Sequence, residues 1–203
     1  MVSSHPEYIE WRKASQSELL LLYGRSHLNS GYHWLSAASL DLLNVLKQES
    51  GESGHVPLFA FLHPDPWLPG FEHVPQQEVI SLLIWQLLEQ FPEILENTSL
   101  FETIQAKMQR EEWQEDDCDE QYDVLVRLLS QRSETYIILD RLDSCICPVD
   151  TFVKNLLRIV SDCATIVKVF VLVGRDFDLN SVISSHKSRL RVLLRDQQRA
   201  KKG

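Results

Sequence analysis

Two aspartates three residues apart follow an apolar stretch in the second half of the chain. The stretch "YIILD" ends at Asp140, and Asp143 follows within "DRLDSC". Such an apolar run is typical of a strand buried on both faces. An acid at the end of that strand is in position to hold a nucleotide-bound magnesium ion. The same pattern arises when an Asp caps a turn or the next helix, so both interpretations stay open.

A second candidate for phosphate chemistry is the segment "YGRSHLNSGYHWL", which lies between an apolar run and a helical pattern. A phosphate-binding loop reads G-x-x-x-x-G-K-[ST]: its backbone N–H groups cradle phosphates, its Lys neutralises charge and its hydroxyl binds magnesium. Here Tyr32 follows Gly31 in place of Lys, and His33 replaces the Ser or Thr. Gly24 also lies two residues further from Gly31 than that pattern allows. The order strand, glycine, loop, glycine, helix is kept, but a plain connecting loop explains it as well.

The elements that would position these groups alternate along the chain. Apolar runs of strand length occupy 18–24, 56–62, 135–140, 165–173 and, more briefly, 188–194. Helical periodicity occupies 32–48, 75–91, 124–131 and 149–160, and residues 93–110 are weakly helical. In 32–48 the apolar stripe is expected to run through Leu35, Ala38, Leu42, Val45 and Leu46. Strands that alternate with helices predict an α/β fold with a mainly parallel five-stranded sheet between two helical layers.

The composition is that of one globular domain, with 44% apolar and 24% charged residues among 203. A formal net charge of −9 disfavours nucleic acid and membrane surfaces as partners. The basic end at 195–203 is short enough to be a solvated tail. There is no signal-peptide pattern and no apolar run of membrane-spanning length. Four Cys with a single C-x-C pair predict free thiols without zinc, in an intracellular compartment, either cytoplasmic or nuclear.

The remaining features leave protein binding open. The seven His form no H-E-x-x-H motif, there is no G-x-S-x-G elbow, and nothing favours Ser–His–Asp chemistry. The acid-rich run 111–123 is either a solvated loop or helix start, or a docking surface for a basic partner. Trp67, Phe71 and Trp113 lie in polar or Pro-rich stretches, where large aromatics anchor interfaces or fold back over a sheet edge.

Over residues 8–195 these segments, in this order, resemble the NACHT-type nucleotide-binding domain of fungal STAND proteins, which are signal-transduction ATPases. The opening "YIEWRKASQSELLLLYG", with Tyr8 and Trp11, is similar to that family's lead-in to its first strand and phosphate loop. "VPLFAFLHPD" and "VISLLIWQLL" resemble its second strand and the helix that follows. The family arrangement implies that strand 18–24 lies centrally, with 135–140 and 165–173 on one side and 56–62 beyond them.

The acidic motif and the sensor carry the rest of the resemblance. "DRLDSC" is similar to the family's D-A-L-D-E-C at Asp140, Leu142, Asp143 and Cys145, and "VLVGRD" keeps only Arg175 of the sensor. The resemblance implies a P-loop NTPase-like fold of the ASCE or STAND type and a single degenerate domain over 1–203. The implied nucleotide-binding site is vestigial and comprises Gly24, Ser30, Gly31, Tyr32, His33, Asp140 and Arg175.

The departures from the family pattern predict a loss of catalysis. The phosphate-loop Lys is absent, its hydroxyl is absent unless Ser30 or Ser36 replaces it, and Ser144 stands where an acid would polarise water. The prediction is an inactive NACHT-like domain without catalytic residues, metal or cofactor. Its role would be that of a scaffold or regulatory subunit that binds a protein partner.

Two alternatives stay open. The domain is a working ATP or GTP switch, or a slow NTPase, in which Asp140 and Asp143 are catalytic and Asp140 holds the magnesium of ATP. In that case Arg175 contacts the γ-phosphate and Gly31 lies at the phosphates. Otherwise the chain is a fragment or truncated paralogue without a task of its own.

Overall fold

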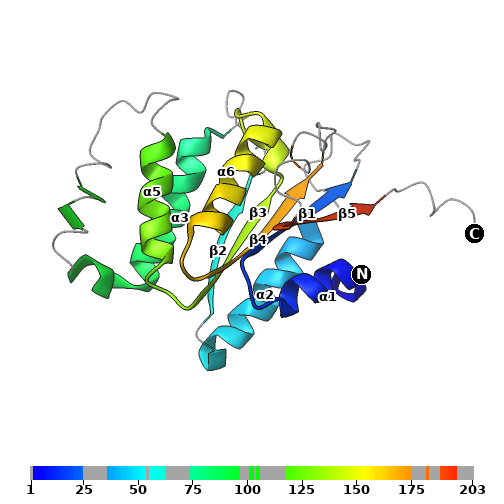
Figure 1. Cartoon of the computed structure of the whole chain (residues 1–203), viewed down its shortest axis with the longest axis horizontal. Coiled ribbons are helices and arrows are strands. Elements are labelled where there is room, and N and C mark those ends of the chain that lie inside the picture. The colour runs from blue at the N-terminus through cyan, green and yellow to red at the C-terminus, as the bar shows by residue number, and fades with distance from the viewer. Residues whose placement is uncertain are drawn as a thin grey trace, which may run out of the picture.

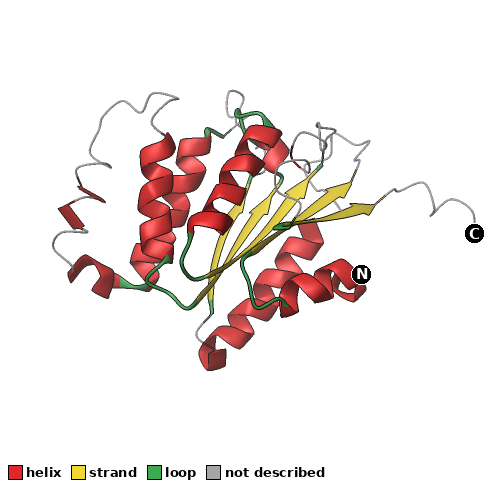
Figure 2. Cartoon of the chain, viewed as in Figure 1, coloured by secondary structure: helices red, strands yellow, loops and turns green. Residues whose placement is uncertain are grey.

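The computed structural model describes residues 2–24, 36–53, 55–62, 74–96, 101–102, 104–105, 118–174, 182 and 188–195. Its centre is a sheet of five strands: β1 (Glu18–Gly24), β2 (Val56–Phe61), β3 (Glu134–Asp140), β4 (Ile166–Val173) and β5 (Leu190–Arg195). All neighbouring strands pair in parallel, in the order β2-β3-β4-β1-β5, and their arrows point the same way in Figure 2. The predicted parallel five-stranded sheet is therefore confirmed.

Helices cover both faces of this sheet and complete the predicted three layers (Figure 1). One layer contains α1 (Pro6–Lys13) and α2 (Ser36–Ser53), and the other contains α3 (Gln76–Gln90), α5 (Cys118–Leu129) and α6 (Val149–Asp162). Short 3-10 turns are η1 (Val2–Ser4), η2 (Pro92–Glu96) and η4 (Leu142–Ser144). The strand order agrees with the arrangement that the resemblance implied, except that β4 is the middle strand and β1 lies next to it.

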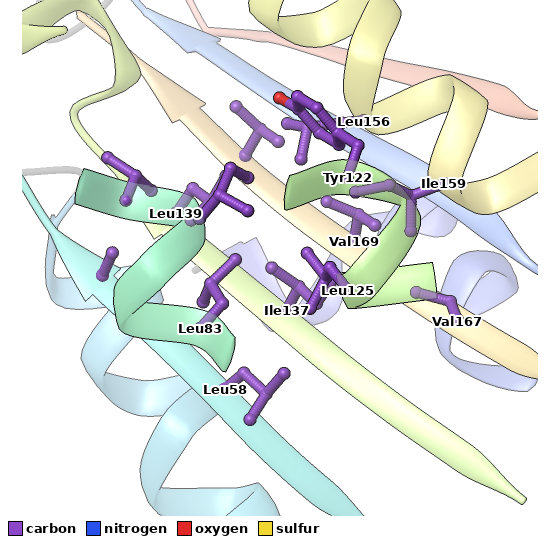
Figure 3. Close-up of a cluster of buried hydrophobic side chains, with 14 of the residues drawn as sticks. Leu58, Leu83, Tyr122, Leu125, Ile137, Leu139, Leu156, Ile159, Val167 and Val169 are labelled. Atoms are coloured by element: carbon purple, nitrogen blue, oxygen red, sulfur yellow. The ribbon is translucent and has the colours of Figure 1, made fainter. Parts of the chain in front are cut away.

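The strands are continuously apolar because each face of the sheet supports its own core. Leu19 and Leu21 of β1 join the core beneath α3, α5 and α6, whereas Leu20 and Leu22 join the core beneath α1 and α2. Figure 3 shows the larger core, in which strand residues such as Ile137 contact the helical layer. Two buried faces explain why no alternation of polar and apolar residues is present in these runs.

Two helices depart from their sequence predictions. In α2 the buried stripe runs through Leu42, Leu43 and Leu46. Val45 is 41% exposed, so the expectation that it belongs to the stripe was wrong, and Leu43 is buried instead. Helix α5 begins at Cys118 rather than at residue 124, which assigns the second half of the acid-rich run to a helix start. Asp119 and Glu120 favour that start, because acids in a first turn interact well with the free N–H groups there.

A buried lysine attaches α1 to the sheet. Lys168 in β4 is fully buried, and its Nζ donates to the carbonyl oxygens of Trp11 (3.0 Å) and Ala14 (2.6 Å) at the end of α1. The Trp11 indole is itself buried and donates from Nε1 to the Glu18 carbonyl at 3.0 Å. Burial lowers the pKa of Lys168 because the charged amine loses water. The Tyr–Trp lead-in of the sequence thus contributes to the core on the α1 and α2 side.

The outer edge of β2 is closed by side-chain amides rather than by another strand. Gln86 of α3 accepts from the Phe59 N–H (2.9 Å) and donates to the Phe59 carbonyl (2.7 Å), as a neighbouring strand would. Gln90 donates to the Pro57 carbonyl at 3.5 Å, and Pro57 has no N–H to satisfy. Sheet edges with unpaired backbone groups invite pairing with other chains, so these contacts protect β2.

Candidate functional site

The structure brings together the strand ends that carry the predicted site residues. Because β3, β4 and β1 are parallel neighbours, their carboxyl ends meet at one edge of the sheet, where Asp140, Gly174 and Gly24 lie. Tyr23 of β1 pairs with Val173 of β4, so the next residues, Gly24 and Gly174, lie at the same height. Ligands of open parallel sheets bind at this edge. Gly24 and Asp140 therefore lie on the edge that the phosphate-site hypothesis requires.

Asp140 is fully buried and contacts the helix that follows the β1 loop. The Ser39 hydroxyl on α2 donates to Asp140 Oδ1 at 3.2 Å, and both side chains have no exposed surface. A hydroxyl on this helix and an acid at the end of β3 are the two oxygen groups that a P-loop NTPase directs at magnesium. The arrangement supplies one carboxylate and one hydroxyl, and no group of three His, Cys, Asp or Glu able to hold a metal ion occurs among the described residues.

Ser39 was missed from the sequence, where only Ser30 and Ser36 were considered as replacements for the hydroxyl that His33 lacks. The signal was the spacing "SAAS", since Ser36 and Ser39 are three residues apart and share a helix face. Ser36 is also buried, and its hydroxyl has no hydrogen-bond partner within the described part of the chain. The register between α2 and Asp140 depends on packing across the sheet, so the sequence spacing did not reveal it.

Asp143 is engaged in holding the strand ends together. Its carboxylate is 1% exposed, Oδ1 accepts the Gly174 N–H at 2.8 Å, and Oδ2 lies 3.5 Å from the Arg141 guanidinium. The hydrogen bond from the Gly174 N–H to Asp143 connects the turn after β3 to the end of β4 and satisfies a buried backbone donor. Arg141 has φ 63° and ψ 49°, and it is the only non-glycine residue with positive φ among those described. A non-glycine residue in the left-handed region is uncommon. Arg141 adopts this conformation while its guanidinium lies beside the Asp143 carboxylate.

The turn after β3 is fixed by backbone bonds on both sides. The Ser144 N–H donates to the Arg141 carbonyl at 2.8 Å, and the Ser144 carbonyl accepts the Val74 N–H at 3.1 Å. Val74 also forms an isolated parallel bridge with Cys145. Ser144, which occupies the place of the expected water-polarising acid, is buried. Its hydroxyl could not abstract a proton as a carboxylate would.

Several predicted residues lie outside the described part of the chain. These are the loop residues Ser30, Gly31, Tyr32 and His33, the sensor residue Arg175, and the aromatics Trp67, Phe71 and Trp113. No disulfide joins Cys118, Cys145, Cys147 and Cys163, all of which lie in the described part of the chain. Burial raises the pKa of the Cys145 thiol to about 12. None of the described helices combines the length and apolarity needed to cross a bilayer.

The strand order, the loop position between β1 and α2, and the Ser39–Asp140 contact define a P-loop NTPase-like domain. The chain belongs to the family described as Nephrocystin 3, N-terminal, whose model matches residues 1–173.

Comparison with solved structures gives distant likenesses. The ORC1 protein of Aeropyrum pernix in complex with DNA has a TM-score of 0.49 and 15% identity, over 91% of this chain and 41% of that one. Drosophila ORC bound to GC-rich DNA and Cdc6 has a TM-score of 0.40 and 14% identity, over 96% of this chain and 33% of that one. This chain spans less than half the length of either, and a search of curated proteins finds no match.

Proposed function

We propose that this NACHT-like domain is catalytically inactive and acts as a scaffold or regulatory subunit that binds a protein partner. The observation that carries the proposal is the engagement of Asp143, whose buried carboxylate bridges Gly174 and Arg141. The Asp143 carboxylate stabilises the fold because it accepts a hydrogen bond from the buried Gly174 N–H. If the carboxylate moved away to take part in a reaction, that N–H would be left unsatisfied.

The sequence departures support the same conclusion. Tyr32 and His33 replace the Lys and the hydroxyl of the phosphate loop, and Ser144 replaces the acid that would polarise water. These losses affect phosphate neutralisation, metal binding and proton abstraction. Removal of one preorganised electrostatic group commonly lowers a rate by about 10²–10³. Because groups that act as a unit do not contribute additively, efficient hydrolysis is not expected after the loss of three.

A working nucleotide switch is the second candidate, and the Ser39–Asp140 contact favours it. The pair would hold magnesium through oxygen ligands, which the ion prefers. Backbone N–H groups at the start of α2 would attract phosphate without a Lys. In this candidate Asp140 and Ser39 are both required for affinity.

Isothermal titration calorimetry with ATP and magnesium tests the two candidates on the full chain. The scaffold proposal expects no binding and no phosphate release. Micromolar affinity that Asp140→Ala or Ser39→Ala abolishes would establish the switch and overturn the scaffold. Asp150→Ala, at a half-buried position in the first turn of α6, is a matched control for loss of one carboxylate.

A further inference from the structure

Helix α3 presents an apolar ridge to solvent. We define the α3 ridge as Glu78, Leu82, Trp85 and Glu89, all of which are exposed. Trp85 is 65% exposed and Leu82 is 42% exposed. The residues are four, three and four positions apart, which places them along one side of a helix in the spacing of a coiled-coil seam. A large exposed Trp at the centre of such a seam is typical of an interface anchor.

The other sides of α3 already have their contacts. Ile80, Leu83, Ile84 and Leu87 are buried in the core, on the side opposite the ridge. Ser81 accepts a hydrogen bond from Gln121 of α5 at 3.2 Å, and Gln86 closes the edge of β2. The ridge therefore lies between the α5 side and the β2 side, away from the sheet. Its apolar residues Leu82 and Trp85 lie in the middle of α3, whereas Asp140 is the last residue of β3.

The charge around the ridge indicates the chemistry of its partner. Residues 76–96, which include α3 and η2, contain four acids and no Lys, Arg or His. The apolar pair is thus flanked by Glu78 and Glu89, and the whole chain carries −9. A second copy of this chain fits poorly, because a parallel or antiparallel pairing of two ridges would bring Glu against Glu. A partner with cations beside its apolar residues would complement the ridge instead.

We propose that the α3 ridge docks an amphipathic basic helix of a partner protein. Apolar residues of that helix would pack on Leu82 and Trp85, and its Lys or Arg residues would face Glu78 and Glu89. Docking by strand addition is excluded at this side, since Gln86 and Gln90 occupy the β2 edge. This inference rests on the proposed scaffold function and names the surface and the partner class for it.

A labelled synthetic helix tests the ridge directly. The probe is a peptide of about three heptads with Leu at a and d and Lys at e and g, and fluorescence anisotropy measures its binding to the full chain. Trp85→Ala should weaken binding about thirtyfold, as expected for loss of an interface anchor. Leu40→Ala is the matched control, since Leu40 is exposed to 50% on α2, in the opposite layer, and its change should leave affinity unaltered.

Charge reversal adds a second, independent test. The double variant Glu78→Lys and Glu89→Lys should lose its affinity for the Lys peptide and gain affinity for an otherwise identical peptide with Glu in place of Lys. The proposal is overturned if the Lys peptide does not bind, or if Trp85→Ala and Leu40→Ala weaken it equally. It is also overturned if sedimentation shows a self-dimer that Trp85→Ala dissociates. ATP titration of the same variants judges the scaffold function separately, because nucleotide binding would contradict that function whatever the peptide does.

Discussion

At the scale of single residues, the second acid of the "DRLDSC" motif, Asp143, has a structural role. Asp143 connects Arg141 and the Gly174 N–H across the turn after β3, with almost no exposed surface. The sequence placed this acid beside the strand end but could not show its hydrogen bonds, because Gly174 is 31 residues away. The motif therefore predicted the place of the acid and not its role.

Asp143→Ala should lower the free energy of unfolding by about 1–3 kcal/mol, because it leaves the buried Gly174 N–H unsatisfied. Urea denaturation measures the change. Asp143→Asn keeps an oxygen acceptor and should restore most of the loss. Asp41→Ala, at an exposed position of α2, should change stability by less than about 0.5 kcal/mol. Equal losses for Asp143→Ala and Asp41→Ala would show that the bond to Gly174 contributes nothing.

Cys145 gives a pH-dependent prediction. Burial raises its thiol pKa from an ordinary value of 9.0 to about 12 in the folded protein. Above pH 9 the unfolded thiol ionises while the folded thiol stays protonated, so stability is complete below pH 9 and declines as the pH rises toward 12. Between pH 8 and 10 the loss from this group should be about 1 kcal/mol.

Cys145→Ala removes this thiol and should flatten the stability profile over that range. Denaturation midpoints of wild type and variant at pH 8, 9 and 10 provide the comparison, and the two profiles should converge as the pH rises. Cys163→Ala is the matched control for loss of a thiol elsewhere. Parallel profiles for wild type and Cys145→Ala would mean that the buried thiol does not contribute.

At the scale of elements, the strands and the central helices were predictable because their patterns are set by burial alone. The run 165–173 predicted β4, and the period of 75–91 predicted α3 within one residue at each end. Contacts between distant elements were not predictable, since a spacing within one element says nothing about its register on another. Gln86 on the β2 edge and Ser39 beside Asp140 are contacts of this kind.

Gln86→Ala should open the outer edge of β2, because it removes both hydrogen bonds to Phe59. The expected loss is about 1–3 kcal/mol in unfolding free energy, together with faster aggregation at high protein concentration. Urea denaturation and light scattering measure the two effects. Gln48→Ala on the exposed side of α2 is the control and should alter neither. Unchanged scattering for Gln86→Ala would show that the edge is protected by other means.

At the scale of the whole molecule, the order of strands decides which end of the chain completes the sheet. β1 lies between β4 and β5, so the last described strand, β5, pairs with the first strand of the chain. The class of the fold followed from the alternation of strands and helices. The strand order followed only from the family resemblance, because many orders satisfy the same alternation.

Deletion of residues 188–203 should expose the β5 side of β1 and yield an aggregated or strongly destabilised chain. The matched deletion of 196–203 retains β5 and should keep the thermal midpoint of the full chain. Circular dichroism and size-exclusion chromatography compare the two. A monomeric, cooperatively unfolding protein without residues 188–203 would contradict the role assigned to β5.

The pairing of β1 with β5 also bears on how the chain is made. Leu19 pairs with Leu190, so the N-terminal strand waits for a neighbour that leaves the ribosome more than 160 residues later. At ordinary rates of translation this interval is on the order of ten to thirty seconds. For most of that interval both edges of β1, which contains four consecutive leucines, lack a partner on the nascent polypeptide, because β4 also lies about 150 residues further along the chain. Chaperone binding to that segment during synthesis is the natural consequence.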